Sequence, residues 1–75
     1  MVTMHNGTGW RVAIYGGEHG MPHFHIEGPG YRCSMAITTL QPIIGSVPRP
    51  VLRAARAWAS GNQDALMRKW RELNG

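Results

Sequence analysis

The chain has 75 residues, a single cysteine and a formal net charge of +4. A chain this short forms one domain with a small core, and one cysteine excludes an internal disulfide framework. Its first residues lack the profile of a signal peptide, and no apolar run is long enough to cross a membrane. We therefore expect a single cytoplasmic domain over residues 1–75 that has no membrane partner.

Three segments alternate apolar and polar residues with the period of two that is typical of half-buried strands: 9–17, 23–28 and 31–38. They predict a three-stranded antiparallel sheet over residues 9–38. Residues 1–8 are expected to be a flexible N-terminus or part of an extra strand. The exposed edges of so small a sheet favour a homodimer.

The second and third segments are joined by the sequence GPG, which predicts a hairpin with a tight turn centred on Pro29-Gly30. This turn sets the register of the two strands. The predicted pairs are Ile26 with Cys33, Phe24 with Met35, Glu27 with Arg32, and His25 with Ser34. Apolar residues then face apolar residues and a carboxylate faces a guanidinium, as a stable hairpin requires.

The alternation ends after the third segment, so residues 39–47 are expected to be a connection and residues 48–74 a pair of helices. The first helix is expected to begin at Pro48 or Pro50, with Ser46 as its cap, and to end at Gly61. Asn62 is the expected cap of the second helix. The predicted fold class is therefore α+β, a three-stranded antiparallel sheet followed by two helices packed on one face.

The motif EHGMPHFHIEG, residues 18–28, concentrates the titratable groups of the chain. It contains three of the four histidines and two of the four carboxylates. Alternation places His23 and His25 on the sheet face opposite Phe24 and Ile26. If helices cover the apolar face, the uncovered face presents a polar set formed by Arg11, Tyr15, His23, His25, Glu27, Arg32 and Ser34.

The spacing of two histidines in this motif is compatible with metal binding. Residues two apart on a strand lie roughly 6.5–7 Å apart on one face, so two imidazoles can converge on one ion. Glu18 or His19, on the loop before His23 and His25, is the expected third ligand. Such ligands suit a divalent metal such as zinc, nickel, copper or iron.

The same residues could instead perform acid–base chemistry without a metal. His23 and His25 would exchange protons, Arg11 and Arg32 would hold a phosphate, and the loop residues Glu18 and His19 would assist. This set is sufficient in principle for RNA cleavage, which uses the 2′-hydroxyl of the RNA as its nucleophile. A purely structural role for the motif, with Glu27 and Arg32 as a cross-strand pair, is the third interpretation.

The C-terminal part of the chain carries the whole excess of positive charge. Residues 46–75 contain six basic and two acidic side chains. Arg49, Arg53 and Arg56 follow the i, i+4, i+7 spacing of one helix face. Such a stripe could follow the phosphates of a nucleic acid or dock an acidic protein.

The stretch YGGEHGMPHFHIEG, together with the third strand and the helix ending in ALMRKWREL, resembles the small bacterial family described as domain of unknown function 4160. The resemblance covers about residues 9–74. The family motif is Glu-His-x-Pro-Pro-His-x-His, and it corresponds here to Glu18, His19, Pro22, His23 and His25. Met21 stands where the family usually has its first proline.

The resemblance implies no settled activity, but it does imply a genetic context. Genes of this family often lie beside a gene for another small protein, in an arrangement like toxin–antitoxin pairs. The leading hypothesis is therefore a toxin–antitoxin-like module that binds or acts on nucleic acid, RNA in particular. The alternatives are a divalent-metal-binding module and a non-catalytic adaptor that docks a neighbouring gene product through Arg49, Arg53 and Arg56. Any enzymatic activity would be of the ribonuclease type, with or without a metal.

Overall fold

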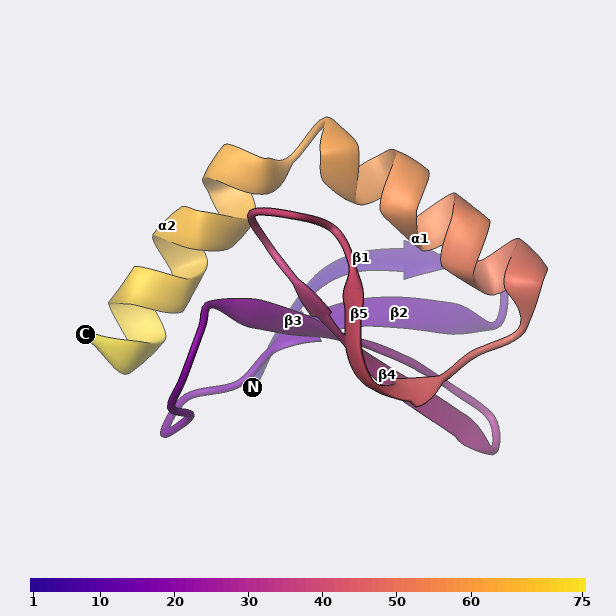
Figure 1. Ribbon diagram of the computed structural model, residues 1–75, viewed down its shortest axis with the longest axis horizontal. Helices are drawn as coiled ribbons and strands as arrows, with labels where there is room; N and C mark the ends of the chain where they lie inside the picture. Colours follow the sequence, from indigo (N-terminus) through magenta and orange to yellow (C-terminus); the bar gives the residue numbers. More distant parts are fainter.

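The N-terminal 46 residues form one antiparallel sheet in the computed structural model, which describes residues 1–75 (Figure 1). The sheet has five strands in the order β1-β2-β3-β4-β5, so each strand pairs with its neighbours along the chain. The strands are β1 (Val2–Gly7), β2 (Trp10–Ile14), β3 (His23–Gly28), β4 (Tyr31–Ala36) and β5 (Pro42–Ser46). Two helices follow, α1 (Arg49–Ser60) and α2 (Gln63–Asn74).

The prediction of a three-stranded sheet is wrong, because the sheet has one more strand at each edge. For residues 1–8 the alternative of an extra strand holds and that of a flexible N-terminus does not, whereas the strand at the other edge was not predicted. β1 lies within residues 1–8, and β5 lies within residues 39–47, which were expected to be a connection. The pairing of each edge strand contains an irregularity, between Thr3 and His5 in β1 and opposite Ser34 and Met35 in β5. Such an irregularity shifts the side chains that follow it to the other face and breaks the period of two. Every residue of β5 is also exposed, so burial imposes no pattern on it. The α+β class itself is retained.

The hairpin of β3 and β4 has the predicted register. Ile26 pairs with Cys33, Phe24 with Met35, Glu27 with Arg32, and His25 with Ser34. Gly30 has φ +74°, which is the conformation that the third position of a type II turn requires. The turn sequence and the apolar pattern therefore agree on one alignment of the two strands.

The helices begin and end near the predicted residues, but their caps differ. Pro48 is the residue before α1 and Gly61 follows its last residue. Ser46 does not cap this helix, because it is the last residue of β5. Asn62 does precede α2, yet its side-chain amide donates to the carbonyl oxygen of Trp58 at 2.8 Å instead of capping the helix.

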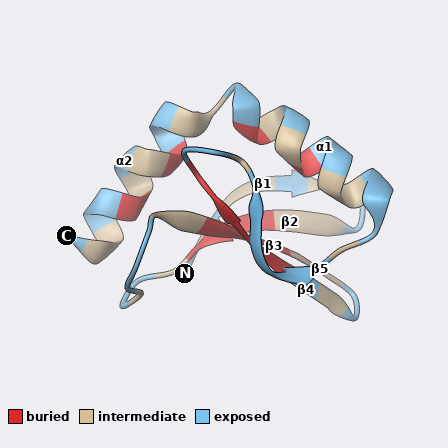
Figure 2. Ribbon diagram, in the orientation of Figure 1, coloured by how far each residue is buried: buried red, intermediate tan, exposed pale blue.

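The hydrophobic core lies between one face of the sheet and the two helices, which arch over that face (Figures 1 and 2). Its buried members are Val12, Ile14, Phe24, Ile26, Met35 and Ile37 from the sheet side and Ala55, Ala59, Leu66 and Trp70 from the helices. Neither helix is long and apolar enough to pass through a bilayer. Because side chains alternate along each strand, His23 and His25 of β3 belong to the other face of the sheet.

Gly45 provides a test of the β4–β5 pairing. Its φ is +80°, and an added Cβ would lie 2.3 Å from the carbonyl oxygen of Arg32. Gly9 has a similar φ of +76° with no atom within 4 Å of an added Cβ. Left-handed backbone costs a residue other than glycine about 1–2 kcal/mol. We expect Gly45→Ala to lower the unfolding free energy, measured by urea denaturation, by clearly more than Gly9→Ala. Equal losses would contradict the close approach of β5 to β4.

Candidate metal centre

The loop between β2 and β3, residues 15–22, brings a carboxylate back over the histidines of β3. The last residue of α2 holds this loop in place. The backbone N–H of Glu18 donates to Asn74 Oδ1 at 2.8 Å, and Asn74 Nδ2 donates to the carbonyl oxygen of Tyr15 at 3.0 Å. The position of Glu18 is therefore set by a contact between residues 56 apart in the chain.

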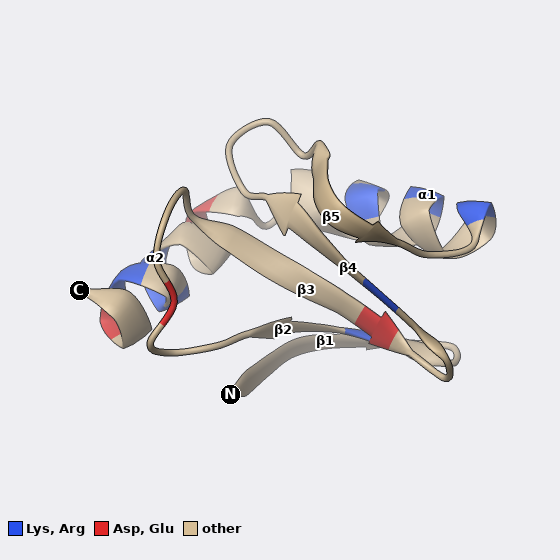
Figure 3. Cartoon of the chain, turned by 60° about the horizontal axis from the view of Figure 1, so that its bottom comes forward, with Lys and Arg blue, Asp and Glu red and all other residues tan.

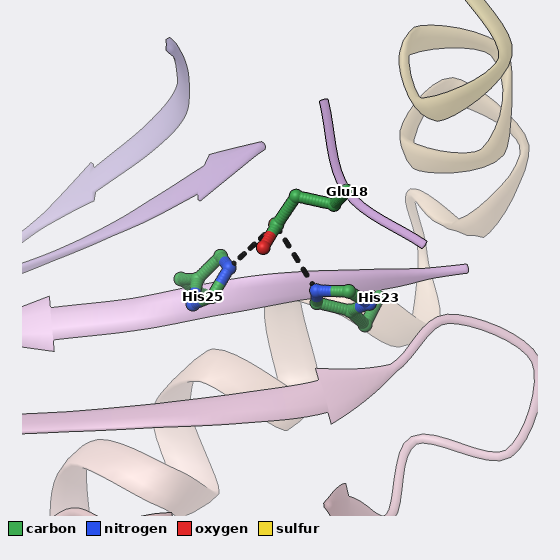
Figure 4. Close-up of side chains that lie close together, drawn as sticks. All are labelled: Glu18, His23 and His25. Atoms are coloured by element: carbon green, nitrogen blue, oxygen red, sulfur yellow. Dashed lines mark hydrogen bonds and ion pairs between the residues drawn. The ribbon is translucent and has the colours of Figure 1, made fainter. Parts of the chain in front are cut away.

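Glu18, His23 and His25 meet at one point, and we call these three residues the trio (Figure 4). Oε1 of Glu18 accepts from Nε2 of His23 at 3.0 Å and from Nε2 of His25 at 2.9 Å. One ligand atom from each residue lies within 4.8 Å of the other two, so the trio could hold a metal ion. His25 is 6% exposed although it lies on the face that the helices leave uncovered.

The second nitrogen of each ring also has a partner. His23 Nδ1 donates to the carbonyl oxygen of Met21 at 2.9 Å, because a carbonyl can only accept. His25 Nδ1 lies 3.3 Å from Ser34 Oγ. Since Nδ1 keeps its proton for Met21, loss of the Nε2 proton that is donated to Glu18 leaves a neutral ring with a lone pair on Nε2. A backbone partner on the rear nitrogen is the usual arrangement of a metal-ligating histidine.

Aromatic neighbours fix the orientation of both imidazoles. Tyr15 packs edge-on against His25, with ring centroids 4.8 Å apart, and the two imidazoles are 5.2 Å apart. Trp70 of α2 lies 4.8 Å from His23. The rings are thus contacted by Tyr15 of the loop after β2, by each other on β3 and by Trp70 of α2, which limits the rotamers that the two histidines can adopt.

The histidines also set the ionisation of the carboxylate. Burial alone would raise the pKa of Glu18, but hydrogen bonds and positive charge from His25 and His23 outweigh it and lower the pKa below the ordinary 4.5. Glu18 is therefore a carboxylate near neutral pH. An ionised carboxylate beside two imidazole nitrogens is a donor set that transition metals accept.

A second cluster surrounds Glu27 at the other end of β3. Arg11 Nε donates to Oε1 at 3.1 Å, Tyr15 donates its hydroxyl to Oε2 at 2.6 Å, and Arg32 Nε lies 3.1 Å from Oε2. Figure 3 shows basic segments on β2 and β4 on either side of this acidic one. Both arginines that were expected to hold a phosphate are therefore paired with one carboxylate.

This pairing shifts two pKa values in opposite directions. Burial would raise the pKa of Glu27, but hydrogen bonds from Tyr15 and Arg11 and the charges of both arginines lower it overall. The hydrogen bond to Glu27 raises the pKa of Tyr15, and burial raises it further. Tyr15 therefore remains a neutral donor that connects the Glu27 cluster to His25.

The remaining predicted residues lie outside the trio. His19 is exposed and lines a hollow of about 470 Å³ that Glu18 also borders, together with Trp70 and Asn74 of α2. Arg49 and Arg53 are exposed on α1, whereas Arg56 donates from Nε to the carbonyl oxygen of Leu40 at 3.1 Å. The sequence is compatible with either Glu18 or His19 as third ligand, and the fold brings only Glu18 to the histidines.

Two residues that support the site, Asn74 and Trp70, were not predicted from the sequence. Neither belongs to the motif, and both come from α2 near the end of the chain. No local signal marks them, because an asparagine at a helix end and a tryptophan on an apolar helix face are ordinary features. Only their contacts with Glu18 and His23 assign them to the site.

The fold and the trio thus define a small α+β domain with a His₂Glu group that could hold a metal ion. The chain belongs to the family described as Domain of unknown function (DUF4160), whose model matches residues 9–71. The matched segment includes the whole trio. Comparisons with curated proteins and with solved structures find no match.

The lowered pKa values of Glu18 and Glu27 predict acid destabilisation of the metal-free protein. Both carboxyls are ionised in the folded state to a lower pH than in the unfolded chain, where the ordinary value is 4.5. As the pH falls below about 4.5, the unfolded chain binds protons first, so the unfolding free energy decreases until the folded carboxyls are also protonated. Urea denaturation between pH 7 and pH 3, with a chelator present, measures this decrease.

The matched variants for this experiment are Glu27→Gln and Glu72→Gln. Glu72 pairs only with Lys69 on the surface of α2 and its side chain is 55% exposed. We expect Glu27→Gln to flatten the profile between pH 7 and pH 3 and Glu72→Gln to leave it close to that of the wild type. A Glu27→Gln profile as steep as the wild-type profile would contradict the assigned role of this carboxyl.

Proposed function

We propose that this domain binds one divalent transition-metal ion through Glu18, His23 Nε2 and His25 Nε2. The observation that carries the proposal is the convergence of three ligand atoms within 4.8 Å, two of them on imidazoles whose rear nitrogens already have partners. The Nε2 atoms of both histidines are hydrogen-bonded to the same carboxylate oxygen, Oε1 of Glu18. A cation placed among them would replace the shared protons and satisfy all three ligands.

The proposed donor set is that of a reactive metal centre. Structural zinc sites close their coordination with four protein ligands, whereas catalytic sites keep three protein ligands and one open position. A bound metal would supply Lewis acidity to a water or substrate oxygen at that position. Within the chain, Met21 and Ser34 hold the rings, and Asn74 holds the backbone of Glu18. We therefore place the activity in the class of metal-assisted chemistry, hydrolysis in the first instance.

Metal-free acid–base catalysis is less well supported by the same geometry. In that mechanism one histidine must take a proton from substrate and the other must deliver one. Here both Nε2 atoms are directed at Glu18, and Arg11 and Arg32 are both paired with Glu27. The two histidines, which this mechanism requires to act separately, therefore share one carboxylate, and the two arginines share another.

Zinc binding tests the proposal directly. We expect native mass spectrometry and calorimetry to detect one zinc ion per chain, and we expect zinc to raise the melting temperature. A ligand that binds only the folded state adds about 2.7 kcal/mol of stability at a hundred times its Kd. Glu18→Gln, His23→Ala and His25→Ala should each lower the affinity at least tenfold. The native spectra also report whether the chain forms the homodimer that the exposed edge strand β5 favours.

His19→Ala is the matched comparison for these variants. It removes an exposed imidazole one residue away from Glu18 that takes no part in the trio. We expect this variant to bind zinc as the wild type does. Equal zinc affinity in His23→Ala and wild type would disprove the proposed site, and loss in His19→Ala alone would move it to the loop.

A toxin–antitoxin-like module that binds RNA is the second candidate function. It is supported by the exposure of Arg49 and Arg53 on α1, in the helix layer and away from the trio. The charge excess of the C-terminal part favours the same surface. Like the first candidate, this one assigns a function to a named surface of the domain.

The RNA hypothesis predicts an affinity that falls steeply with salt concentration. Replacing Arg49 and Arg53 together with glutamine should weaken binding and make the salt dependence shallower. If the arginine surface instead docks a neighbouring gene product, that protein should co-purify with the domain after nuclease treatment, and RNA binding should be absent.

A further inference from the structure

The trio borders a cavity of about 360 Å³ that is lined by residues of the sheet and the β2–β3 loop and by none of the helices. Besides the trio, its lining includes Arg32 and Ser34 of β4 and Ile44 of β5. Arg32 and Ser34 were expected on the same face as the histidines, whereas Ile44 joins them only because β5 pairs with β4. The cavity therefore joins the proposed metal position to a basic and an apolar side chain.

Arg32 is held at this cavity from two sides. Its Nε lies 3.1 Å from Oε2 of Glu27, and its guanidinium carbon lies 5.2 Å from the centre of the Tyr15 ring. A guanidinium has five N–H donors, so the contact through Nε leaves the two terminal amino groups for a ligand. The side chain is 57% exposed. Arg32 is thus an oriented donor group that remains accessible to solvent.

The charges around the cavity favour an anion. Arg11 and Arg32 together exceed Glu27 by one positive charge, and a divalent metal at the trio would exceed Glu18 by one more. Two excess positive charges match the dianion of a phosphate monoester more closely than the single charge of a carboxylate. Guanidinium groups also bind phosphate oxygens through two parallel hydrogen bonds.

Ile44 supplies the apolar part of the same cavity. It is 71% exposed and pairs with Ser34, the residue next to His25 across the hairpin. Gly45, which follows it, has no side chain to cover the cavity. An organic substituent on a bound phosphate would gain by covering Ile44, since burial of apolar surface contributes roughly 25 cal/mol per Å².

We infer that this cavity binds a phosphate group attached to an apolar or aromatic substituent, between the metal position at the trio and the guanidinium of Arg32. The inference rests on the proposed metal site and specifies the substrate class of that site. Phosphate oxygens are bound by the metal and by Arg32, and the substituent lies on Ile44.

Titration calorimetry with phenylphosphonate tests the inference. This probe carries a phosphate-like group on an aromatic ring and resists hydrolysis. Each variant is first titrated with zinc, and the zinc-loaded protein is then titrated with the probe. We expect saturable binding to the wild type, at least tenfold weaker binding to Arg32→Gln, and unchanged binding to Arg68→Gln, which removes an exposed arginine of α2 outside this cavity.

Two further comparisons separate the parts of the site. Methylphosphonate should bind more weakly than phenylphosphonate to the wild type, and Ile44→Ser should reduce that difference. Benzoate, with one charge, should bind more weakly than phenylphosphonate. Both comparisons use the protein whose zinc content has already been measured.

The outcomes distinguish the two proposals. Normal zinc binding with loss of phenylphosphonate binding only in Arg32→Gln supports both of them. Normal zinc binding with equal probe affinity in wild type and Arg32→Gln, or with no saturable probe binding, overturns the phosphate inference and leaves the metal site intact. Absence of zinc binding in the wild type overturns the proposed function and, with it, the inference.

Discussion

The rest of the site depends on one carboxylate that accepts hydrogen bonds from two imidazoles. Oε1 of Glu18 binds Nε2 of His23 and Nε2 of His25, and this shared oxygen brings a loop, a strand and two rings to one point. The Glu18 side chain is 28% exposed, and such partners offset the cost of removing part of its charge from water. No buried side-chain nitrogen or oxygen of the domain lacks a hydrogen-bond partner. The trio is therefore part of the folded structure as well as a candidate metal centre.

The two polar clusters of the sheet are connected through Tyr15. Its hydroxyl donates to Glu27, its ring packs on His25, and the guanidinium of Arg32 lies over it. Glu27 in turn orients both Arg11 and Arg32. Each arginine contacts Glu27 through its Nε, and the three side chains together keep one positive charge in excess. Because both arginines are paired with Glu27, neither is a free phosphate-binding group. The same pairing nevertheless positions Arg32 at the cavity beside the trio.

Helix α2 contributes to the site although it lies far from the motif in the sequence. α2 covers the core with Leu66 and Trp70, and its last residue holds the backbone of Glu18. Core packing and site geometry therefore share one element. A substitution that moves the end of α2 would displace the loop and change the position of Glu18 relative to the histidines. The stability of α2 and the geometry of the trio are coupled for this reason.

The sequence by itself determined the three central strands, the register of the β3–β4 hairpin and the two helices, because burial on one face imposes a period on each of them. It also placed His23 and His25 on one face. It did not determine the edge strands, whose irregular pairing and exposure remove the period. The tertiary structure alone decided that Glu18, and not His19, meets the histidines. That choice depends on a hydrogen bond to Asn74, 56 residues away, and no local pattern can encode a contact formed only when α2 packs on the sheet.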